Sequence, residues 1–284
     1  MDKKFPKYIV SEFAICNLAV APIRAFPDDR SEMISQLLFG ELCEILDYKN
    51  KSWVKIKCTF DGYVGWIDPK QIQYVEENVF QKYQGYHPCS TDIALPLMNQ
   101  NLSFPILLGS TLPFYDGISL KMPNAHYTFS GSTIDIDSIP INEELIMKLS
   151  KRFLNAPYLW GGRSPFGIDC SGLVQQVYKI LGVPMKRDAS LQVEGGELVP
   201  FPQAARVGDL AFFDNAEGII HHVGIILDDQ KIIHASGKVR IDTLDQNGII
   251  HSDTGKYTHK LRIIKRVLKY EESKGQITLQ SERK

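Results

Sequence analysis

The sequence predicts an α+β protein in which two small β-barrels precede a domain of mixed helices and strands. Between residues 12 and 137 the chain consists of short strand-like runs punctuated by Gly, Pro and Asp, a texture typical of small barrels. After residue 170, one amphipathic stretch precedes three apolar runs with strand character. A length of 284 residues with 44% apolar content fits two or three domains.

The barrel prediction depends on alternation and on a weak internal repeat. Trp53–Ile56 and Tyr63–Ile67 alternate apolar and polar residues as half-buried strands do. Leu37–Glu41 is echoed by Leu107–Pro113, which indicates a second, divergent copy. We therefore predict four segments: a first barrel at residues 1–76, a second barrel at 77–137, the mixed domain at 138–270 and a frayed polar tail at 271–284.

Cys170 stands at the start of the predicted helix. The apolar residues recur at i, i+1, i+4, i+7 and i+8 as one stripe, formed by Leu173, Val174, Val177, Ile180 and Leu181. Gly182 and Pro184 end the helix. We expect the unpaired amides of its first turn to lower the thiol pKa of Cys170 and to accept the negative charge of a tetrahedral intermediate. The alternative for a cysteine beside an apolar stripe is an inert, packed residue.

Two histidines lie on predicted strands downstream, His222 at the start of one strand and His234 within the next, with a turn at 228–230 between them. Because strand side chains alternate, we expect His221 and His222 to point to opposite faces, so that only one can face Cys170. An odd loop length would place His222 and His234 directly opposite each other on one face. In that arrangement His222 acts as general base and His234 fixes its tautomer. Each histidine alone could instead be a polar edge residue.

Composition excludes several other classes of protein. The formal net charge is −1, and acidic and basic residues are interspersed, so the charge pattern does not indicate binding to nucleic acid or to an anionic membrane. No apolar run approaches the roughly 20 residues that span a bilayer. The sequence has no C-x-x-C, no H-E-x-x-H and no second cysteine near Cys170, so we expect no metal and no cofactor. The sequence does not indicate the oligomeric state.

The cysteines bear on the cellular compartment. There are five, at positions 16, 43, 58, 89 and 170, and their odd number and scatter argue against a disulfide framework. Pro6, Ser11 and Glu12 interrupt any apolar core that a signal peptide would need near the N-terminus. We therefore expect a cytoplasmic protein, with export as the alternative if a leader has been removed.

Five short motifs, in order and at compatible spacings, carry a family resemblance. They are Pro157–Gly162, Gly167–Gln175, Gly208–Leu210, His222–Ile225 and Ile233–Ser236. Through them the segment from Ile141 to Val267 resembles the NlpC family of cell-wall cysteine peptidases, which have a papain-like fold. The resemblance implies that Cys170 is the nucleophile, His222 the base and His234 the orienting residue. His221 does not fit, because the base of the family directly precedes Val-Gly.

The N-terminal half resembles bacterial SH3-type domains, well in its first copy through Gly40-Glu41, Trp53 and Gly65-Trp66, and loosely in its second. Two such domains before this peptidase resemble γ-D-glutamyl-L-diamino acid endopeptidases. The resemblance implies cleavage of stem peptides from peptidoglycan between γ-D-Glu and meso-diaminopimelate or L-Lys. It also implies a need for a free N-terminal L-Ala, release of L-Ala-γ-D-Glu, and a role in recycling. A secreted hydrolase of the intact wall and a non-catalytic wall-binding scaffold are the alternatives.

An enclosed substrate ammonium needs anionic and hydroxyl partners, because a desolvated unpaired charge is costly. The resemblance implies as partners Tyr158, Asp169, Ser171, Tyr63, Glu32 and Ser190, with Glu41 as the alternative to Glu32. Asp169 could instead serve as a helix N-cap, and Tyr158 as a packed aromatic residue. Trp160 is expected to form part of the wall of the site.

Overall fold

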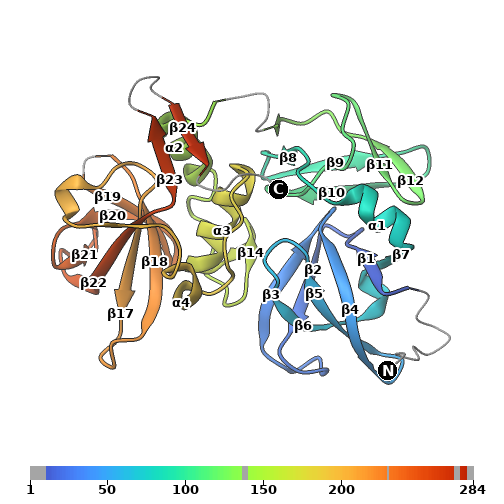
Figure 1. Cartoon of the computed structure of the whole chain (residues 1–284), viewed down its shortest axis with the longest axis horizontal. Helices are drawn as coiled ribbons and strands as arrows, with labels where there is room; N and C mark the ends of the chain where they lie inside the picture. The colour runs from blue at the N-terminus through green and yellow to red at the C-terminus, as the bar shows by residue number, and fades with distance from the viewer. Residues whose placement is uncertain (1–10, 136–139, 229, 272–275, 280–284) are drawn as a thin grey trace. The chain divides into compact units, whose positions relative to one another are not determined.

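Figure 1 shows the computed structural model of the chain, which describes residues 11–135, 140–228, 230–271 and 276–279. Pro6, the start of the interdomain linker and part of the polar tail lie outside these ranges. The chain divides into two compact units. Unit 1 comprises residues up to 135 together with 160–164, and unit 2 comprises 136–159 together with the residues from 165 onward.

The first part of unit 1 is a seven-stranded antiparallel sheet around one hydrophobic core. Its elements are β1 (Phe13–Ile15), β2 (Val20–Arg24), β3 (Met33–Leu38), β4 (Leu42–Lys49), β5 (Trp53–Cys58), β6 (Val64–Ile67), the 3-10 turn η1 (Pro69–Gln71) and β7 (Gln73–Val75). The strand order is β3-β2-β6-β5-β4-β1-β7. In β5 every second residue is buried, as the alternation predicts. Those buried side chains join the core of this sheet.

The second part of unit 1 is a smaller set of strands. Its elements are α1 (Glu77–Tyr83), β8 (Cys89–Ser90), β9 (Ala94–Met98), β10 (Ser103–Leu107), β11 (Ser119–Met122), β12 (Ala125–Thr128) and β13 (Thr133–Ile134), followed by β14 (Arg163–Ser164). Strands β10-β9-β12-β11 form one sheet, and β13 pairs with β8. Its core includes Phe80 of α1 and is continuous with side chains from the first part of unit 1, including Ile15 of β1 and Phe39, which follows β3.

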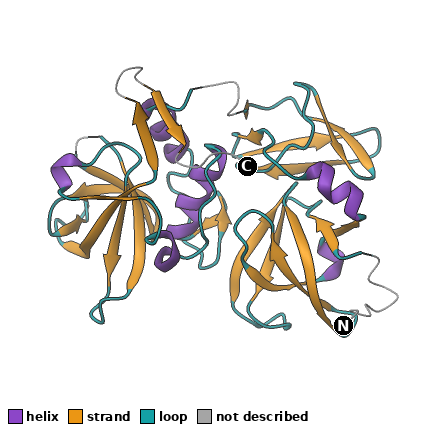
Figure 2. Ribbon diagram, viewed as in Figure 1, coloured by secondary structure: helices purple, strands orange, loops and turns teal. Residues whose placement is uncertain are grey.

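Unit 2 is built around a ring of strands, drawn in orange in Figure 2. Its elements are α2 (Glu143–Lys151), β15 (Gly167–Ile168), α3 (Cys170–Ile180), α4 (Ala189–Gln192), β16 (Glu197–Val199), η2 (Pro202–Ala204), β17 (Leu210–Asp214), β18 (Ile220–Ile226), β19 (Lys231–Ser236), β20 (Lys238–Leu244), β21 (Gly248–Ile250), β22 (Tyr257–Arg266), β23 (Leu268–Glu271) and β24 (Gln276–Leu279). The order β22-β17-β18-β19-β20-β21 closes because β21 pairs back onto β22. Phe213, Ile226, Ile232 and Leu244 contribute to the enclosed core.

Helix α3 follows the sequence prediction closely. Asp169 is its N-cap, accepting a hydrogen bond from the amide of Gly172 at 2.7 Å, and Gly182 follows its end with a positive φ of 76°. Every residue of the helix is buried, and it contacts β18 and β19. The helix therefore brings Cys170 to the strands that carry the two predicted histidines.

The prediction of a frayed tail is wrong in part. Residues 276–279 form β24, which pairs with β23 in antiparallel register, and Ile277 is buried and bridged to Ile141. One apolar side chain with a partner strand is enough to order a segment that is polar by composition. None of the helices in the described part of the chain has the length and apolar character needed to cross a bilayer.

Candidate active site

A chain of buried polar side chains runs across three neighbouring strands of unit 2. The Nε2 atom of His222 lies 2.9 Å from Nδ1 of His234, and Nε2 of His234 lies 3.0 Å from Oδ2 of Asp242. His234 is 0% exposed, and the other two side chains are buried as well. Such a chain can fix which ring nitrogen of each histidine carries a proton.

The two histidines share a face, as predicted, but they are not directly opposite. The register pairs Ile225 with Ile233 and Ile226 with Ile232, which places Gly224 opposite His234. The histidines are thus diagonal neighbours, which imidazole rings can still bridge. A Cβ at Gly224 would lie 2.7 Å from Cδ1 of Ile232 and 3.0 Å from Cβ of His234, so any larger residue would displace Ile232 and press on His234.

The expectation that His221 and His222 point to opposite faces is corrected by a β-bulge. Strand β17 pairs Phe213 with His222 but Asp214 with Ile220, so His221 has no partner across the ladder. A bulge of this kind re-aims side chains and is common next to active sites. The ring centroids of His221 and His222 are 6.5 Å apart. His221 is nevertheless exposed, whereas His222 is buried.

Cys170 is buried at the first position of α3, with 7% of its surface exposed. Burial raises the pKa of its thiol to about 12, and the negative charge of Asp169 adds to this rise; hydrogen bonds from the amides of Val223 and Ser171, and the charge of Arg187, oppose it. The prediction of a lowered thiol pKa is therefore wrong, because the cost of desolvating the thiolate exceeds the favourable effect of the helix N-terminus.

Burial has the opposite effect on the imidazole. It lowers the pKa of His222 well below its ordinary value, and repulsion from His259, His234 and His221 adds to the change. At neutral pH the thiol of Cys170 and the imidazole of His222 are thus both uncharged. These shifts favour formation of the thiolate by proton transfer to His222 over a preformed ion pair.

Asp242 completes the chain and was missed in the sequence. Arg240 donates to it from Nε at 2.8 Å and from Nη2 at 3.0 Å, and the hydroxyl of Ser252 donates at 2.6 Å. Burial alone would raise the pKa of Asp242, but the hydrogen bonds from His234, Arg240 and Ser252 together hold it far below its usual range. In the sequence Asp242 is an acidic residue on a strand, and such residues are common without any function, so nothing pointed to it.

Tyr158 lies close to the nucleophile, as the resemblance implies. Partial burial raises the pKa of its hydroxyl to about 12, and the charges of Cys170 and Asp169 contribute to the rise. The backbone amide of Tyr158 donates to the carbonyl of Gly237 at 3.0 Å. The phenol therefore stays protonated and can donate a hydrogen bond to a substrate oxygen near Cys170.

Asp169 and Ser171, predicted to meet the substrate ammonium, are engaged by Arg187, which the sequence did not indicate. The Arg187 guanidinium is 2% exposed and donates to Oδ1 of Asp169 at 3.0 Å, to Oδ2 at 2.5 Å and to the hydroxyl of Ser171 at 2.9 Å. The Asp169 carboxylate also caps α3. Its charge is thus neutralised by a buried ion pair. Ser190 is exposed on α4, whereas Ala189 beside it is buried.

The predicted residues of the first barrel all lie in unit 1. Glu32 is exposed, and its Oε1 accepts a hydrogen bond from the indole of Trp160 at 2.5 Å. Glu41 is buried, and both of its oxygens accept hydrogen bonds from Arg163 at 2.9 Å. Tyr63 packs its half-buried ring against the core of the first sheet.

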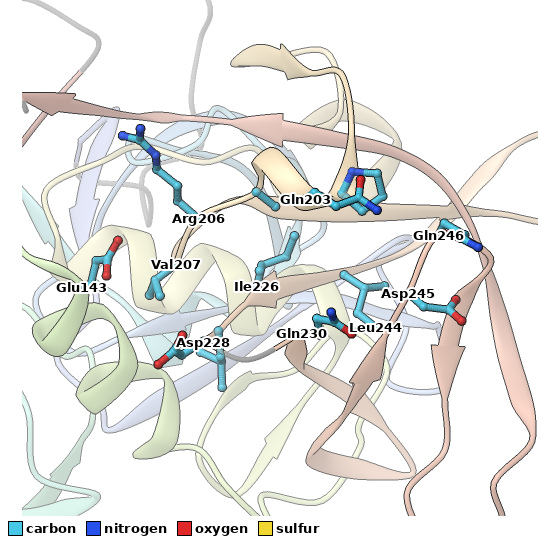
Figure 3. Close-up of a pocket in the computed structure, with 13 residues that line it drawn as sticks. Glu143, Gln203, Arg206, Val207, Ile226, Asp228, Gln230, Leu244, Asp245 and Gln246 are labelled. Atoms are coloured by element: carbon cyan, nitrogen blue, oxygen red, sulfur yellow. The ribbon is translucent and has the colours of Figure 1, made fainter.

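A separate pocket of about 490 Å³ opens elsewhere in unit 2 (Figure 3). Ile226 and Leu244 contribute to its lining, with Glu143, Arg206 and Asp228 among its polar residues. Ile226 is four residues beyond His222 on β18, roughly 13 Å along an extended strand. The pocket thus lies toward the opposite end of the strand ring and contains none of the three predicted catalytic residues.

The fold and the site define a cysteine peptidase with a Cys-His-His arrangement on a helix and two strands. A family model described as NlpC/P60 family matches residues 155–258, and one described as bacterial dipeptidyl-peptidase SH3 domain matches residues 23–72. The chain is similar to a gamma-D-glutamyl-L-lysine dipeptidyl-peptidase of Bacillus cereus, with 30% identity over 252 residues, which cover 79% of this chain and 74% of the relative.

Two further comparisons agree with these matches. Dipeptidyl-peptidase 6 of Lysinibacillus sphaericus is 25% identical over 261 residues, covering 82% of this chain and 92% of the relative. A crystal structure of an NlpC/P60 family protein from Bacillus cereus superposes with a TM-score of 0.75 at 23% identity, covering 89% of this chain and 99% of the other. The chain belongs to the NlpC/P60 family of cysteine peptidases. The predicted papain-like fold with a preceding SH3-type domain is confirmed.

Proposed function

We propose that this peptidase hydrolyses stem peptides of peptidoglycan between γ-D-Glu and L-Lys or meso-diaminopimelate and releases L-Ala-γ-D-Glu. The observation that carries the proposal is the chain from Asp242 through His234 to His222, beside a cysteine at a helix start. The name of the Bacillus cereus relative, a gamma-D-glutamyl-L-lysine dipeptidyl-peptidase that aligns over most of its length, supports this class of substrate.

The hydrogen-bond chain sets the tautomer of the base. Ionised Asp242 can only accept, so His234 donates from Nε2 and its Nδ1 becomes an acceptor. His222 must then donate from Nε2 to His234, which leaves the lone pair of its Nδ1 available. That lone pair is what a general base needs in order to take the thiol proton of Cys170.

The reaction then follows in balanced steps. His222 removes the proton from Cys170, the sulfur bonds to the γ-carbonyl carbon, and the amides of the first turn of α3 with Tyr158 donate to the oxyanion. His222 next gives its proton to the nitrogen of the diamino acid as the carbon–nitrogen bond breaks. Water, deprotonated by His222, cleaves the thioester, and the sulfur leaves with a proton from the imidazolium.

We propose Glu32 as the main anionic partner of the free L-Ala ammonium. The carboxylate of Glu41 is committed to Arg163, and that of Asp169 is committed to Arg187. Glu32 is exposed, and Trp160 donates a hydrogen bond to its Oε1. Glu32→Gln should raise KM for peptides with a free amine, while Asp28→Asn, which removes another exposed carboxylate of unit 1, should not.

A requirement for a free amine connects the reaction to recycling. In the intact wall the L-Ala nitrogen is acylated, so peptides with a free ammonium arise only after turnover. The odd number and scatter of the five cysteines in the sequence support a reducing compartment, where such peptides would be reused. We therefore propose a role in cytoplasmic recycling of wall peptides.

The direct test incubates the protein with L-Ala-γ-D-Glu-L-Lys, with its diaminopimelate counterpart and with the N-acetylated form of each, and follows the products by mass spectrometry. We expect L-Ala-γ-D-Glu from the free peptides only, and no product with Cys170→Ala. Equal cleavage of the acetylated peptides would overturn the requirement for a free amine. Absence of cleavage under reducing conditions would support a binding protein instead.

A further inference from the structure

A fourth histidine lies against the catalytic pair and has no part in the mechanism above. His259, on β22, stacks on His222 with ring centroids 4.1 Å apart and an interplanar angle of 23°. Its Nδ1 lies 2.9 Å from the hydroxyl of Thr258, and its side chain is half-buried. The phenyl ring of Phe213 lies against both imidazoles, at 5.7 Å from His222 and 5.9 Å from His259.

Two β-bulges on either side of Phe213 produce this cluster. One shifts the register between β17 and β18 after Phe213, and the other shifts the register between β17 and β22 before it. The second bulge skips Arg262, so the alternation of β22 changes direction between Ile263 and Leu261. A regular strand pattern would not predict that His259 faces His222.

One interpretation of the clustered imidazoles of His222, His234 and His259 is a metal site. One nitrogen of each of His222, His234 and His259 lies within 4.8 Å of the others. A metal ion binds imidazole in the ring plane at about 2.0–2.1 Å. Because His222 and His259 overlie each other nearly in parallel, an ion in the plane of one ring sits above the face of the other. The stacked geometry therefore does not present three ligands to one ion.

We propose that His259 is a positioning residue, whose uncharged ring holds the catalytic imidazole of His222 in its reactive orientation; this inference rests on the proposed function of that site. The hydrogen bond to His234 holds the His222 ring at its Nε2 edge only. The stacked ring of His259 restrains the ring plane on one face as well.

The charge of His259 matters as much as its shape. Burial lowers its pKa to about 4, and repulsion from His234 and His221 contributes, while Asp242 acts in the opposite direction. Above that pH the ring is neutral and presents a π face to His222, which favours the imidazolium that forms during catalysis. A protonated His259 would instead repel that imidazolium, since the two charges would be stacked.

The groups around His259 define the pH behaviour. His221 and His222 approach from β18, His234 from β19 and Asp242 from β20. Activity needs neutral His222 and is lost as pH falls through the pKa of that imidazole. A protonated His259 repels the protonated His222 and lowers the pKa of His222; a ring that cannot be protonated removes this repulsion, so the pKa of His222 rises and the acid limb of activity moves to higher pH.

The test compares His259→Phe, His259→Ala and the control His221→Phe in the full-length protein. Phenylalanine keeps a flat ring on His222 without a charge, whereas alanine removes the ring. We expect His259→Ala to lower kcat at least about tenfold with KM within about twofold, since a small misplacement of a catalytic group is costly. His259→Phe should keep kcat within about threefold, because the flat ring remains in place. It should also move the acid limb to higher pH. The control His221→Phe should keep kcat near that of the wild type and move the acid limb less, because His221 contributes least to the lowered pKa of His222.

A second measurement does not depend on the identity of the substrate. The rate at which iodoacetamide alkylates Cys170 reports proton transfer to His222, with His222→Ala as the lower reference. We expect His259→Ala to approach that reference and His259→Phe to stay near the wild type. Unchanged rates in His259→Ala, or equal losses in the two variants with an unmoved acid limb, would overturn the proposal. Failure of the wild type to cleave the peptides would contradict the proposed function alone.

Discussion

Substitution of Asp242 by Asn tests whether the buried chain sets the tautomer of the base. An asparagine amide can donate a hydrogen bond to Nε2 of His234, which a carboxylate cannot. Nδ1 of His234 would then carry the proton, His222 would have to accept at Nε2, and the proton of His222 would sit on Nδ1. The base would thereby lose the lone pair that Cys170 needs, although no contact with the substrate has changed.

The magnitude has an electrostatic part and a tautomer part. From Oδ2 of Asp242 to Nε2 of His222 the path includes hydrogen bonds of 3.0 and 2.9 Å and the width of one imidazole ring. At about 8 Å and an effective dielectric constant of about 20, one charge contributes about 2 kcal/mol, or about 30-fold in rate. Arg240 offsets some of this charge. The wrong tautomer adds to the loss, so we expect kcat to fall by about 10²- to 10³-fold.

The assay is the steady-state rate of cleavage of L-Ala-γ-D-Glu-L-Lys, with thermal unfolding recorded for each variant. Asp253→Asn is the matched control, because Asp253 also accepts from Nη2 of Arg240 at 3.0 Å but is 73% exposed and outside the chain to His234. We expect Asp253→Asn to stay within about twofold of the wild type, as expected for an exposed ion pair. A folded Asp242→Asn protein with kcat within about threefold of the wild type would refute the tautomer reasoning, since base catalysis should contribute far more.

Three further outcomes follow from the same geometry. The ultraviolet absorbance of the Cys170 thiolate is the part of the signal that Cys170→Ala removes. It should be absent at neutral pH and appear only as pH rises toward about 12. A titration midpoint below neutrality would instead show a preformed ion pair. Gly224→Ala should lower kcat roughly tenfold or more, because its Cβ would press on Cβ of His234, and unchanged kinetics would mean that the strands give way. Arg187→Met should lower the free energy of unfolding in urea by about 3–5 kcal/mol, because it leaves Asp169 buried without its cation; a loss below about 1 kcal/mol would contradict this.

Local patterns predicted the helix and the histidine strands. The apolar stripe, the N-cap and the following glycine defined α3 within the sequence itself, and strand alternation placed His222 and His234 on one face. The direct opposition of these histidines was wrong because it depended on the pairing register, which the loop length alone does not fix. Periodicity gives the face of a residue, whereas its exact partner depends on the turn.

The parts that could not be predicted involve distant segments or burial. Arg163 and Glu41 are 122 positions apart, and nothing near either residue indicates the other. His259 faces His222 because the bulge that skips Arg262 interrupts the regular alternation of β22. The pKa of Cys170 was predicted in the wrong direction because the favourable helix terminus is visible in the sequence, while the depth of burial that outweighs it is not.

Covalent labelling of the nucleophile tests the central claim most directly. A diazomethyl ketone of L-Ala-γ-D-Glu, which places an electrophilic carbon where the scissile carbonyl would lie, should react with the protein once per chain. Peptide mapping by mass spectrometry should find the adduct on Cys170, with the other four cysteines unmodified and labelling strongly slowed in His222→Ala. An adduct on another residue, or labelling of Cys170 at the same rate without His222, would contradict a Cys170–His222 peptidase.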